Sequence, residues 1–415
     1  MSIDQNLESS LRRWMQEGAA TRPSTEATAR MRARVAPGRQ RPAWLSRATV
    51  RPMRWERTSG VGDAWVRTIA LLGAAAILAG LLVGGVLAAG RFLLPAVVNP
   101  GTVNGAIAFD AGLDIFRVNP DGTGLRALTT DSNADSDPTW SPDGSRIAFW
   151  SHLGRSGPLS LVLIAGDGTG RREIHETGEI TFPGSTGGHP NISWDPQGDR
   201  LAILGTVAGR GTPVIVDVAT GRLTPVPVGN LDVFTVLWSP DGTELAVAGE
   251  APSGRSIWTI KPDGSNAQRV RPDSADGADY TSIAWSPDSR SLAYSRAGTH
   301  VTHDVYVVDL TSGAERLIAT GGEYFWPRFS PDGLSIAFTE GVNPALWVAK
   351  ADGSGARTIA PGIASEDITW APDGTKVLAF SPDLTTLDVI PIGGGAIVAI
   401  DSRGNVGAPS WQRLP

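Results

Sequence analysis

The chain has 415 residues, a formal net charge of −6 and no cysteine. The lack of thiols excludes disulfide bonds, thiol catalysis and cysteine-ligated zinc. The charge is divided unevenly, because residues 1–66 carry 12 Arg and 6 Asp or Glu, whereas residues 103–415 carry 22 Lys or Arg and 36 Asp or Glu. A basic head and an acidic body indicate different surroundings, and the acidic body argues against nucleic acid as a partner.

Residues 1–35 are expected to form a partly helical cytoplasmic head. Leu7, Leu11, Trp14 and Met15 follow a helical spacing, and a second short helix is expected from about residue 24 to residue 35. Helices of this length are marginal on their own. We therefore interpret the head either as a docking element that gains order on a partner or as a solvated, mostly disordered segment.

Residues 36–66 form a linker rich in Arg, Pro and Trp, as expected next to a membrane, where Arg meets anionic lipid and Trp favours the interface. Residues 67–92 are expected to form a transmembrane helix, because 68–90 is a run of 23 residues without a charge. The positive-inside rule then places the N-terminus in the cytoplasm and the body outside. Residues 93–102 form a short exit linker.

The rest of the chain repeats one phrase. It reads WSPDGSRIAF at Trp140–Phe149 and recurs, with changes, from Trp194, Trp238, Trp285, Phe329 and Trp370. These starting positions are 54, 44, 47, 44 and 41 residues apart. A period of roughly 40–45 residues is typical of a four-stranded propeller blade. Residues 103–415 are therefore predicted to be an all-β propeller.

The first copy of the phrase shows how one blade is built. Ser141-Pro-Asp-Gly144 has the residues of a tight turn, and it joins a strand ending at Trp140 to a strand at 147–150. Residues 159–164 and 171–174 supply two further strands around a second glycine-containing turn. Four antiparallel strands place both turns on one rim, and packing such sheets radially buries their faces.

The two ends of this region complement each other. Ala106–Phe109 resembles the second strand of a blade without a Trp phrase before it, and Pro409-Ser-Trp-Gln412 resembles the first strand without a second strand after it. We expect the C-terminal strand to complete the first blade, which removes open sheet edges. This count gives seven blades. A six-bladed ring with one degenerate unit is the alternative, and the unit at Trp194 is the weakest because its interval is the longest.

The repeated W-S-P-D-G…I-A-F phrase resembles the TolB-type, WD-like propeller repeat of bacterial envelope proteins, over residues 103–415. The segments LRRWMQEGA, ATARMRARV and RQRPAWLSR loosely resemble the heads of membrane-bound anti-sigma-like regulators of high-GC bacteria. That second resemblance implies a sigma factor or another cytoplasmic regulator as a partner. The zinc-binding version of such heads is excluded, since the chain has no Cys and no His before His152.

Several polar groups have both a chemical and a structural interpretation. Asp131-Ser-Asn-Ala-Asp-Ser-Asp137 places oxygen ligands on alternate positions, as a calcium loop does, but lacks the expected Gly and Glu, so we favour a polar loop. His300 and His303 with Asp304 have a spacing that permits a metal pair, although solvated loop histidines are the simpler explanation. The repeated Asp residues are explained by their turns and the repeated Trp residues by a core between blades.

The rim opposite the turns carries the longer loops, where binding residues concentrate. The candidate binding residues there are Tyr280, His300, His303, Tyr324, Phe325 and Trp326. For the aromatic residues, burial at a blade junction is the alternative. The chain contains no G-x-S-x-G, Walker or H-E-x-x-H motif, so we predict neither catalysis nor a cofactor.

These observations predict a single-pass cell-membrane protein with an extracytoplasmic seven-bladed propeller. The propeller is expected to bind a protein, peptide or glycan, and to act as a sensor that relays to the cytoplasmic regulator. A passive envelope scaffold is one alternative. A hydrolase or lyase acting in the ring channel is the other.

Overall fold

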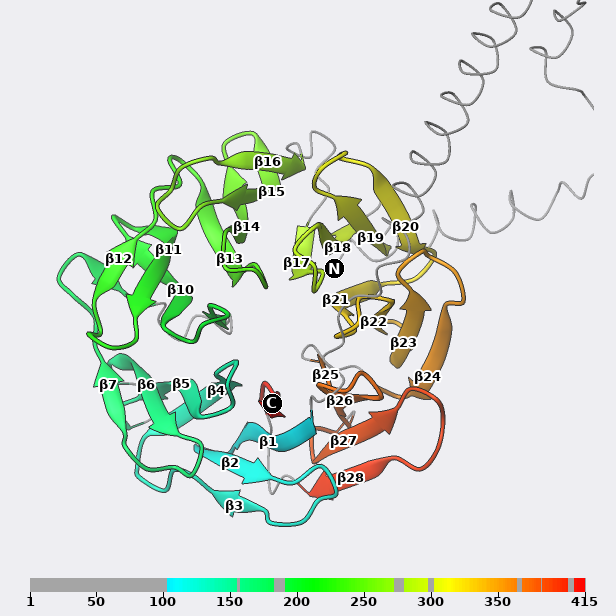
Figure 1. The fold of residues 1–415 in the computed structure, drawn as a ribbon, viewed down its shortest axis with the longest axis horizontal. Helices are drawn as coiled ribbons and strands as arrows, with labels where there is room; N and C mark the ends of the chain where they lie inside the picture. The colour runs from blue at the N-terminus through cyan, green and yellow to red at the C-terminus, as the bar shows by residue number, and fades with distance from the viewer. Residues whose placement is uncertain are drawn as a thin grey trace, which may run out of the picture. The chain divides into compact units, whose positions relative to one another are not determined.

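The computed structural model describes residues 103–154, 157–182, 191–271, 280–297, 302–363, 368–381, 383–401 and 407–414. They form seven sheets arranged as the blades of a ring (Figure 1). Within these ranges no helix is long and apolar enough to cross a membrane. The predicted head, linker, transmembrane helix and exit linker (1–35, 36–66, 67–92 and 93–102) lie outside the described residues.

The first three blades contain strands β1 to β12 and the last strand of the chain. Blade 1 consists of β29 (Ser410–Leu414), β1 (Val103–Ala111), β2 (Asp114–Val118) and β3 (Arg126–Ala127). Blade 2 consists of β4 (Ala134–Trp140), β5 (Arg146–His152), β6 (Leu159–Ala165) and β7 (Arg172–Ile174). Blade 3 consists of β8 (Ile180–Thr181), β9 (Ile192–Trp194), β10 (Arg200–Val207), β11 (Arg210–Asp217) and β12 (Leu223–Pro225).

The other four blades each follow chain order. Blade 4 consists of β13 (Asp232–Trp238), β14 (Leu245–Ala251), β15 (Gly254–Ile260) and β16 (Gln268–Arg271). Blade 5 consists of β17 (Tyr280–Trp285), β18 (Ser291–Ala297), β19 (His303–Asp309) and β20 (Glu315–Ala319). Blade 6 consists of β21 (Tyr324–Phe329), β22 (Ser335–Glu340), β23 (Ala345–Lys350) and β24 (Arg357–Pro361). Blade 7 consists of β25 (Thr369–Trp370), β26 (Lys376–Phe380), β27 (Thr386–Pro391) and β28 (Val398–Asp401).

The C-terminal strand closes the ring, as predicted. Strand β29 pairs antiparallel with β1, and Trp411 lies opposite Ile107. The indole Nε1 of Trp411 donates to the backbone oxygen of Gly105 at 3.1 Å. Blade 1 is therefore built from both ends of the described region (Figure 1), which confirms seven blades and excludes the six-bladed alternative.

Blade 3 departs from the common pattern at its first strand. Both β8 and β9 pair with β10: Trp194 lies opposite Leu201, and Thr181 lies opposite Thr206. The position that other blades fill with one strand is thus divided between two short strands. The residues between them explain why the interval before Trp194 is the longest in the chain. The unit that the sequence marked as weakest is a complete blade with an insertion.

The repeated Trp residues pack between blades, as predicted. Trp140, Trp194, Trp238, Trp285, Trp370 and Trp411 are each 5–9 % exposed. In three blades the indole N–H also donates to a backbone oxygen just before the phrase of the preceding blade. The pairs are Trp194 to Thr139, Trp285 to Leu237 and Trp370 to Arg328, at 3.2, 3.3 and 2.9 Å. One residue type therefore fills the space between blades and hydrogen-bonds across it.

The Ser-Pro-Asp-Gly turns are held by their own aspartates. In blade 4, Ser239 Oγ and the backbone N–H of Thr243 both donate to Asp241 Oδ1, at 2.6 and 3.0 Å. Gly242 has a φ of 73°, which a residue without a side chain adopts at little cost. Blades 2, 5 and 6 repeat the Ser-to-Asp bond. This confirms that the repeated carboxylates serve their turns.

Candidate functional site

The ring has two rims of different character. The turn rim carries the Ser-Pro-Asp-Gly turns and the second turn of each blade, and the loop rim carries the opposite connections. Of the six predicted binding residues, His303, Tyr324, Phe325 and Trp326 lie at the loop-rim ends of β19 and β21, in blades 5 and 6. Tyr280 begins β17 in blade 5, opposite Arg296. His300 lies outside the described residues.

His303 and Phe325 are brought together by the junction of blades 5 and 6. The backbone N–H of His303 donates to the backbone oxygen of Gly322 at 3.0 Å, and His303 forms a parallel bridge with Glu323. The two rings then lie 4.4 Å apart between centroids, at an angle of 46°. Both side chains are half-buried. His303 Nδ1 is buried and has no hydrogen-bond partner among the described residues.

Tyr324 lies beneath this pair and fits the alternative of burial at a blade junction. It is 8 % exposed, and its ring meets those of Phe338 and Trp347 edge-on, at 5.3 and 5.7 Å. Burial raises the pKa of the Tyr324 hydroxyl, and the carboxylates of Glu340 and Asp304 raise it further. Tyr324 therefore supports the surface from below and stays protonated.

Trp326 is placed by a bulge in β21. The register of β21 against β22 shifts between Phe325 and Arg328, and Trp326 has a φ of 54°. Its backbone N–H donates to Ser282 Oγ of the preceding blade at 3.1 Å. A non-glycine residue with positive φ is uncommon and persists where the surroundings fix it. The bulge therefore sets the course of the chain next to the His303–Phe325 pair.

Three carboxylates lie near this junction, but they are not all on the face of the aromatic pair. Glu340 is buried, and its Oε2 accepts the indole N–H of Trp347 at 2.9 Å. Asp304 Oδ1 is buried without a hydrogen-bond partner in the described part of the chain. A side chain added at Gly341 would lie 3.2 Å from the Phe325 ring and 3.4 Å from a carboxylate oxygen of Glu323. Glu323 is therefore the carboxylate beside Phe325, whereas Glu340 and Asp304 act on the buried Tyr324. An aromatic ring beside a carboxylate is suited to a cationic side chain.

We name the residues His303, Asp304, Glu323, Phe325 and Glu340 the blade 5–6 cluster. Sequence analysis found His303 and Phe325 and noted Asp304, but it missed Glu323 and Glu340. Glu340 comes just after the repeated IAF phrase of its blade, and Glu323 comes just before the aromatic run at 324–326. This nearness in sequence to the strand ends was the available signal. The pairing of β19 with the segment before β21 could not be derived from spacing.

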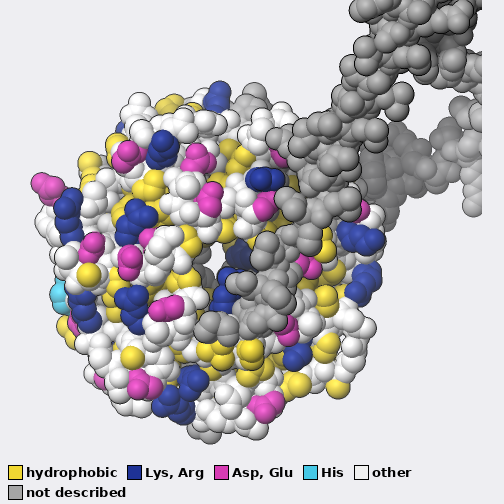
Figure 2. Space-filling model, in the orientation of Figure 1, with side chains coloured by type: hydrophobic (Ala, Val, Ile, Leu, Met, Phe, Trp, Pro, Cys, Tyr) yellow, Lys and Arg dark blue, Asp and Glu magenta, His cyan; other side chains and the backbone are white. Residues whose placement is uncertain are grey.

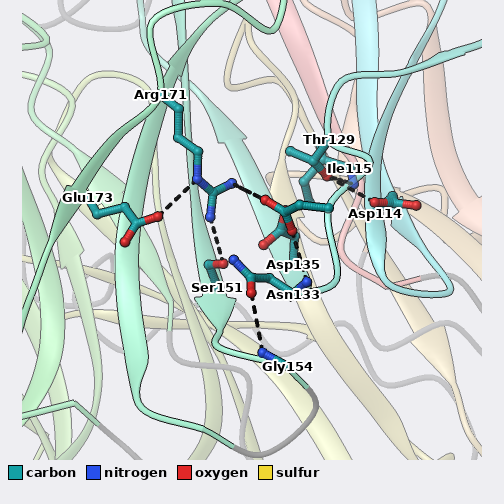
Figure 3. Close-up of polar contacts among 10 residues, drawn as sticks. Asp114, Ile115, Thr129, Asn133, Asp135, Ser151, Gly154, Arg171 and Glu173 are labelled. Carbon is teal, nitrogen blue, oxygen red and sulfur yellow. Dashed lines mark hydrogen bonds and ion pairs between the residues drawn. The ribbon is translucent and has the colours of Figure 1, made fainter.

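The acidic loop before blade 2 is occupied by an arginine. Arg171 lies 3.6 Å from both Asp131 and Asp135, 3.0 Å from Glu173, and donates to Ser151 Oγ at 2.9 Å (Figure 3). The Asp135 side chain is fully buried, and burial raises its pKa. A guanidinium thus stands where a calcium loop would hold its ion. The predicted polar loop is confirmed for residues 131–133 only, because residues 134–137 belong to strand β4.

The described histidines have local protein contacts. His152 Nδ1 lies 3.3 Å from the backbone oxygen of Gly157, and His175 Nδ1 lies 2.9 Å from Ser160 Oγ. In the part of the chain that the structure describes, no group of three His, Asp or Glu residues is arranged to hold a metal ion. The metal pair that the spacing of His300 and His303 permits is not tested, because His300 falls outside that part.

The surface of the ring mixes both signs of charge. Figure 2 shows acidic and basic side chains interspersed over the visible face, with basic side chains at the hollow in the centre. No single basic stripe crosses this view, as a nucleic-acid footprint would require.

The fold has relatives among known proteins. Dipeptidyl-peptidase 5 of Porphyromonas gingivalis is 30 % identical over 239 residues, 54 % of this chain and 32 % of that protein. The Protein TolB homolog of Chlorobium luteolum is 28 % identical over 173 residues, 42 % of this chain and 36 % of that protein. The chain therefore spans about a third of the length of these two relatives.

A solved structure also has a similar fold. Oligogalacturonate lyase from Vibrio parahaemolyticus superposes with a TM-score of 0.52 at 16 % identity, over 65 % of this chain and 80 % of that chain. Because propellers serve many functions, this likeness concerns the fold alone. Residues 167–414 match the family described as the TolB beta propeller domain. With its repeated Ser-Pro-Asp-Gly turns and a ring closed by the C-terminal strand, the chain belongs to the TolB β-propeller family.

Proposed function

We propose that this chain is a membrane-anchored envelope protein whose propeller binds a protein or peptide partner at the blade 5–6 cluster. The observation that carries the proposal is the contact of His303 with Phe325 beside the carboxylate of Glu323. Binding residues concentrate on loops that a rigid scaffold holds. The partner we expect presents a Lys or Arg side chain, which an aromatic face and a carboxylate hold together.

The charge of the propeller favours the same class of partner. Residues 103–415 carry 36 acidic and 22 basic side chains, a surplus of 14 negative charges. A surplus of one sign accelerates encounter with a partner of the opposite sign, and this effect weakens as salt is added. A neutral glycan would gain nothing from this field, so salt dependence distinguishes a basic peptide from a glycan.

Binding is tested with purified full-length protein and a panel of synthetic peptides in which Lys and Arg are present or replaced by Ala. We expect the basic peptides to bind more tightly at low salt, and His303→Ala and Phe325→Ala to weaken them about tenfold. His152→Ala, at the loop-rim end of β5 in blade 2, is the matched control. Equal binding of basic and Ala-substituted peptides, or equal binding by all three variants, contradicts the proposal.

The second half of the proposed function is a relay to a cytoplasmic regulator such as a sigma factor. It is supported by the basic, partly helical head at 1–35 and by the uncharged run at 68–90. Crosslinking in intact cells compares the full-length protein with a variant that lacks residues 5–35. Recovery of a cytoplasmic regulator only with the full-length protein supports the relay. Recovery of the same envelope proteins with both, and no cytoplasmic one, leaves an anchored scaffold.

A further inference from the structure

An open cavity lined by both polar and apolar residues lies where the ring closes, on the turn rim. Its volume is about 550 Å³, and its walls come from β1, β2 and β29 of blade 1 and from β26 and β28 of blade 7. The polar side chains that line it are those of Asn104, Arg117, Asn119, Asp121, Lys376 and Gln412. Cavities of this size are typical of small-molecule sites. The cavity is far from the blade 5–6 cluster, which lies on the other rim.

Four of the six polar side chains in the cavity are already engaged. Gln412 Oε1 accepts the backbone N–H of Ala106 at 2.9 Å, and its Nε2 donates to the backbone oxygen of Gly144 at 2.7 Å. Asn104 exchanges two hydrogen bonds with the blade 7 turn residue Asp373, at 2.7 and 3.1 Å.

The other two engaged side chains belong to the turn after β2. Asp121 Oδ1 accepts both the backbone N–H and the hydroxyl of Thr123, at 2.9 and 2.7 Å. Asn119 Nδ2 donates to the same hydroxyl at 3.0 Å. These hydrogen bonds lower the pKa of Asp121, so its carboxylate is ionised but committed to its own turn. Each of the four therefore has at least one structural hydrogen bond within the protein.

The two remaining groups are cations. Arg117 on β2 and Lys376 at the start of β26 are both half-buried, and neither forms an ion pair with any described residue. Arg117 Nε is buried and makes no hydrogen bond within the described ranges. A buried donor without a partner costs free energy, and a cation without a counterion costs more. Residues 103–415 carry 36 acidic side chains, yet none of the described ones pairs with either cation.

We propose that this cavity binds a carboxylate-bearing small molecule between Arg117 and Lys376. A guanidinium presents a rigid fork that matches a carboxylate in two parallel hydrogen bonds, and an ammonium adds a second, less directional charge. Among the side chains that line the cavity, two cations stand against the single carboxylate of Asp121, which favours an anionic ligand with one carboxylate. The remaining volume takes one or two rings or a short chain attached to that carboxylate.

Such a ligand would also tie the two ends of the ring together. Arg117 belongs to blade 1 and Lys376 to blade 7, and these blades meet where the C-terminal strand closes the ring. A ligand that binds only the closed ring raises the unfolding temperature, and the rise continues with the logarithm of ligand concentration above the Kd. Calorimetry and thermal stability are therefore two linked readouts of the same site that must agree.

The test titrates full-length protein with glucuronate and succinate, with glucose as the neutral counterpart and with inorganic phosphate as a second anion. Calorimetry measures affinity and a thermal scan measures stabilisation. We expect glucuronate or succinate to bind at least tenfold more tightly than glucose. Arg117→Gln and Lys376→Gln should each weaken this binding at least tenfold, whereas Lys350→Gln, at the exposed end of β23 in blade 6, should leave it unchanged.

Three outcomes of this test would contradict the proposal. Phosphate binding without carboxylate binding overturns the carboxylate assignment. If Lys376→Gln and Lys350→Gln weaken carboxylate binding equally, the effect is one of general charge and the proposed site is wrong. The site is also wrong if neither glucuronate nor succinate binds. If Arg117→Gln does not fold, the binding measured with Lys376→Gln tests the site, because this variant leaves the half-buried Arg117 in place. None of these results depends on peptide binding at the loop rim.

Discussion

Gln412→Ala tests whether the hydrogen bonds of the C-terminal strand hold the ring closed. Gln412 lies on β29 and is 8 % exposed. Its amide accepts from Ala106 of β1 and donates to Gly144 in a turn of blade 2. The alanine variant leaves both backbone groups without these partners, at a position where water has little access. The substitution keeps the strand and removes the two bonds together with the packing of the Gln412 side chain against Gly105 and Gly144.

The size of the effect follows from those two groups. A buried backbone group that loses its partner costs about 1–3 kcal/mol, so two such groups cost about 2–6 kcal/mol. The entropy of unfolding is about 2.1 cal/mol/K per residue, or about 0.6 kcal/mol/K for a unit of about 300 residues. The unfolding temperature should therefore fall by about 3–9 °C.

The assay is a calorimetric scan of the full-length protein beside Gln268→Ala. Gln268 is exposed and makes only a long side-chain contact with Asn266, at 3.4 Å, so it controls for the loss of a glutamine. We expect the control to unfold within about 1 °C of the unchanged protein. Equal unfolding temperatures for the two variants would refute the reasoning, because they would mean that the buried amide does not hold the seam.

Three further outcomes follow from the structure. Trp370→Phe removes an indole hydrogen bond between blades, whereas the indole N–H of Trp140 has no partner among the described residues. Trp370→Phe should therefore lower the free energy of unfolding by about 1 kcal/mol more than Trp140→Phe does. Urea unfolding measures both variants. Arg171→Met leaves the fully buried carboxylate of Asp135 without its cation and should cost about 3–5 kcal/mol at pH 7, with the loss shrinking as acid neutralises that carboxyl. Burial raises the pKa of Asp135, so the stability that its protonated carboxyl contributes is complete below pH 3.8 and is lost as the pH rises through the folded-state pKa. The unchanged protein should therefore lose stability relative to Asp135→Asn as the pH rises. A constant difference in stability between the two proteins from pH 3.5 to 7 would contradict this.

The architecture could be derived from the repeated phrase. A period near that of one blade, turn residues at fixed offsets and complementary half-blades at Ala106–Phe109 and Pro409–Gln412 were enough to predict seven blades and their closure. These signals are local: a turn depends on its own Ser, Asp and Gly, and a strand on its own alternation. The same local logic explained the repeated aspartates as turn residues, and their hydrogen bonds bear this out.

The split first strand of blade 3 and the blade 5–6 cluster were decided by packing. His303 meets Phe325 because the start of β19 bridges the segment before β21, a pairing that no spacing rule supplies. Tyr324, next to Phe325 in sequence, is buried because a strand sends successive side chains to opposite faces and the aromatic core of blade 6 lies on its side. Sequence alone could list these aromatics without deciding which of them reach the surface.

The cavity at the seam depends most completely on the tertiary structure. Arg117 and Lys376 belong to the first and last blades, and they line one cavity only because β29 pairs with β1. Neither residue lies in a recognisable motif. Their shared property is a positive charge that forms no ion pair among the described residues. It arises from what the closed ring places around them, which the linear sequence does not show.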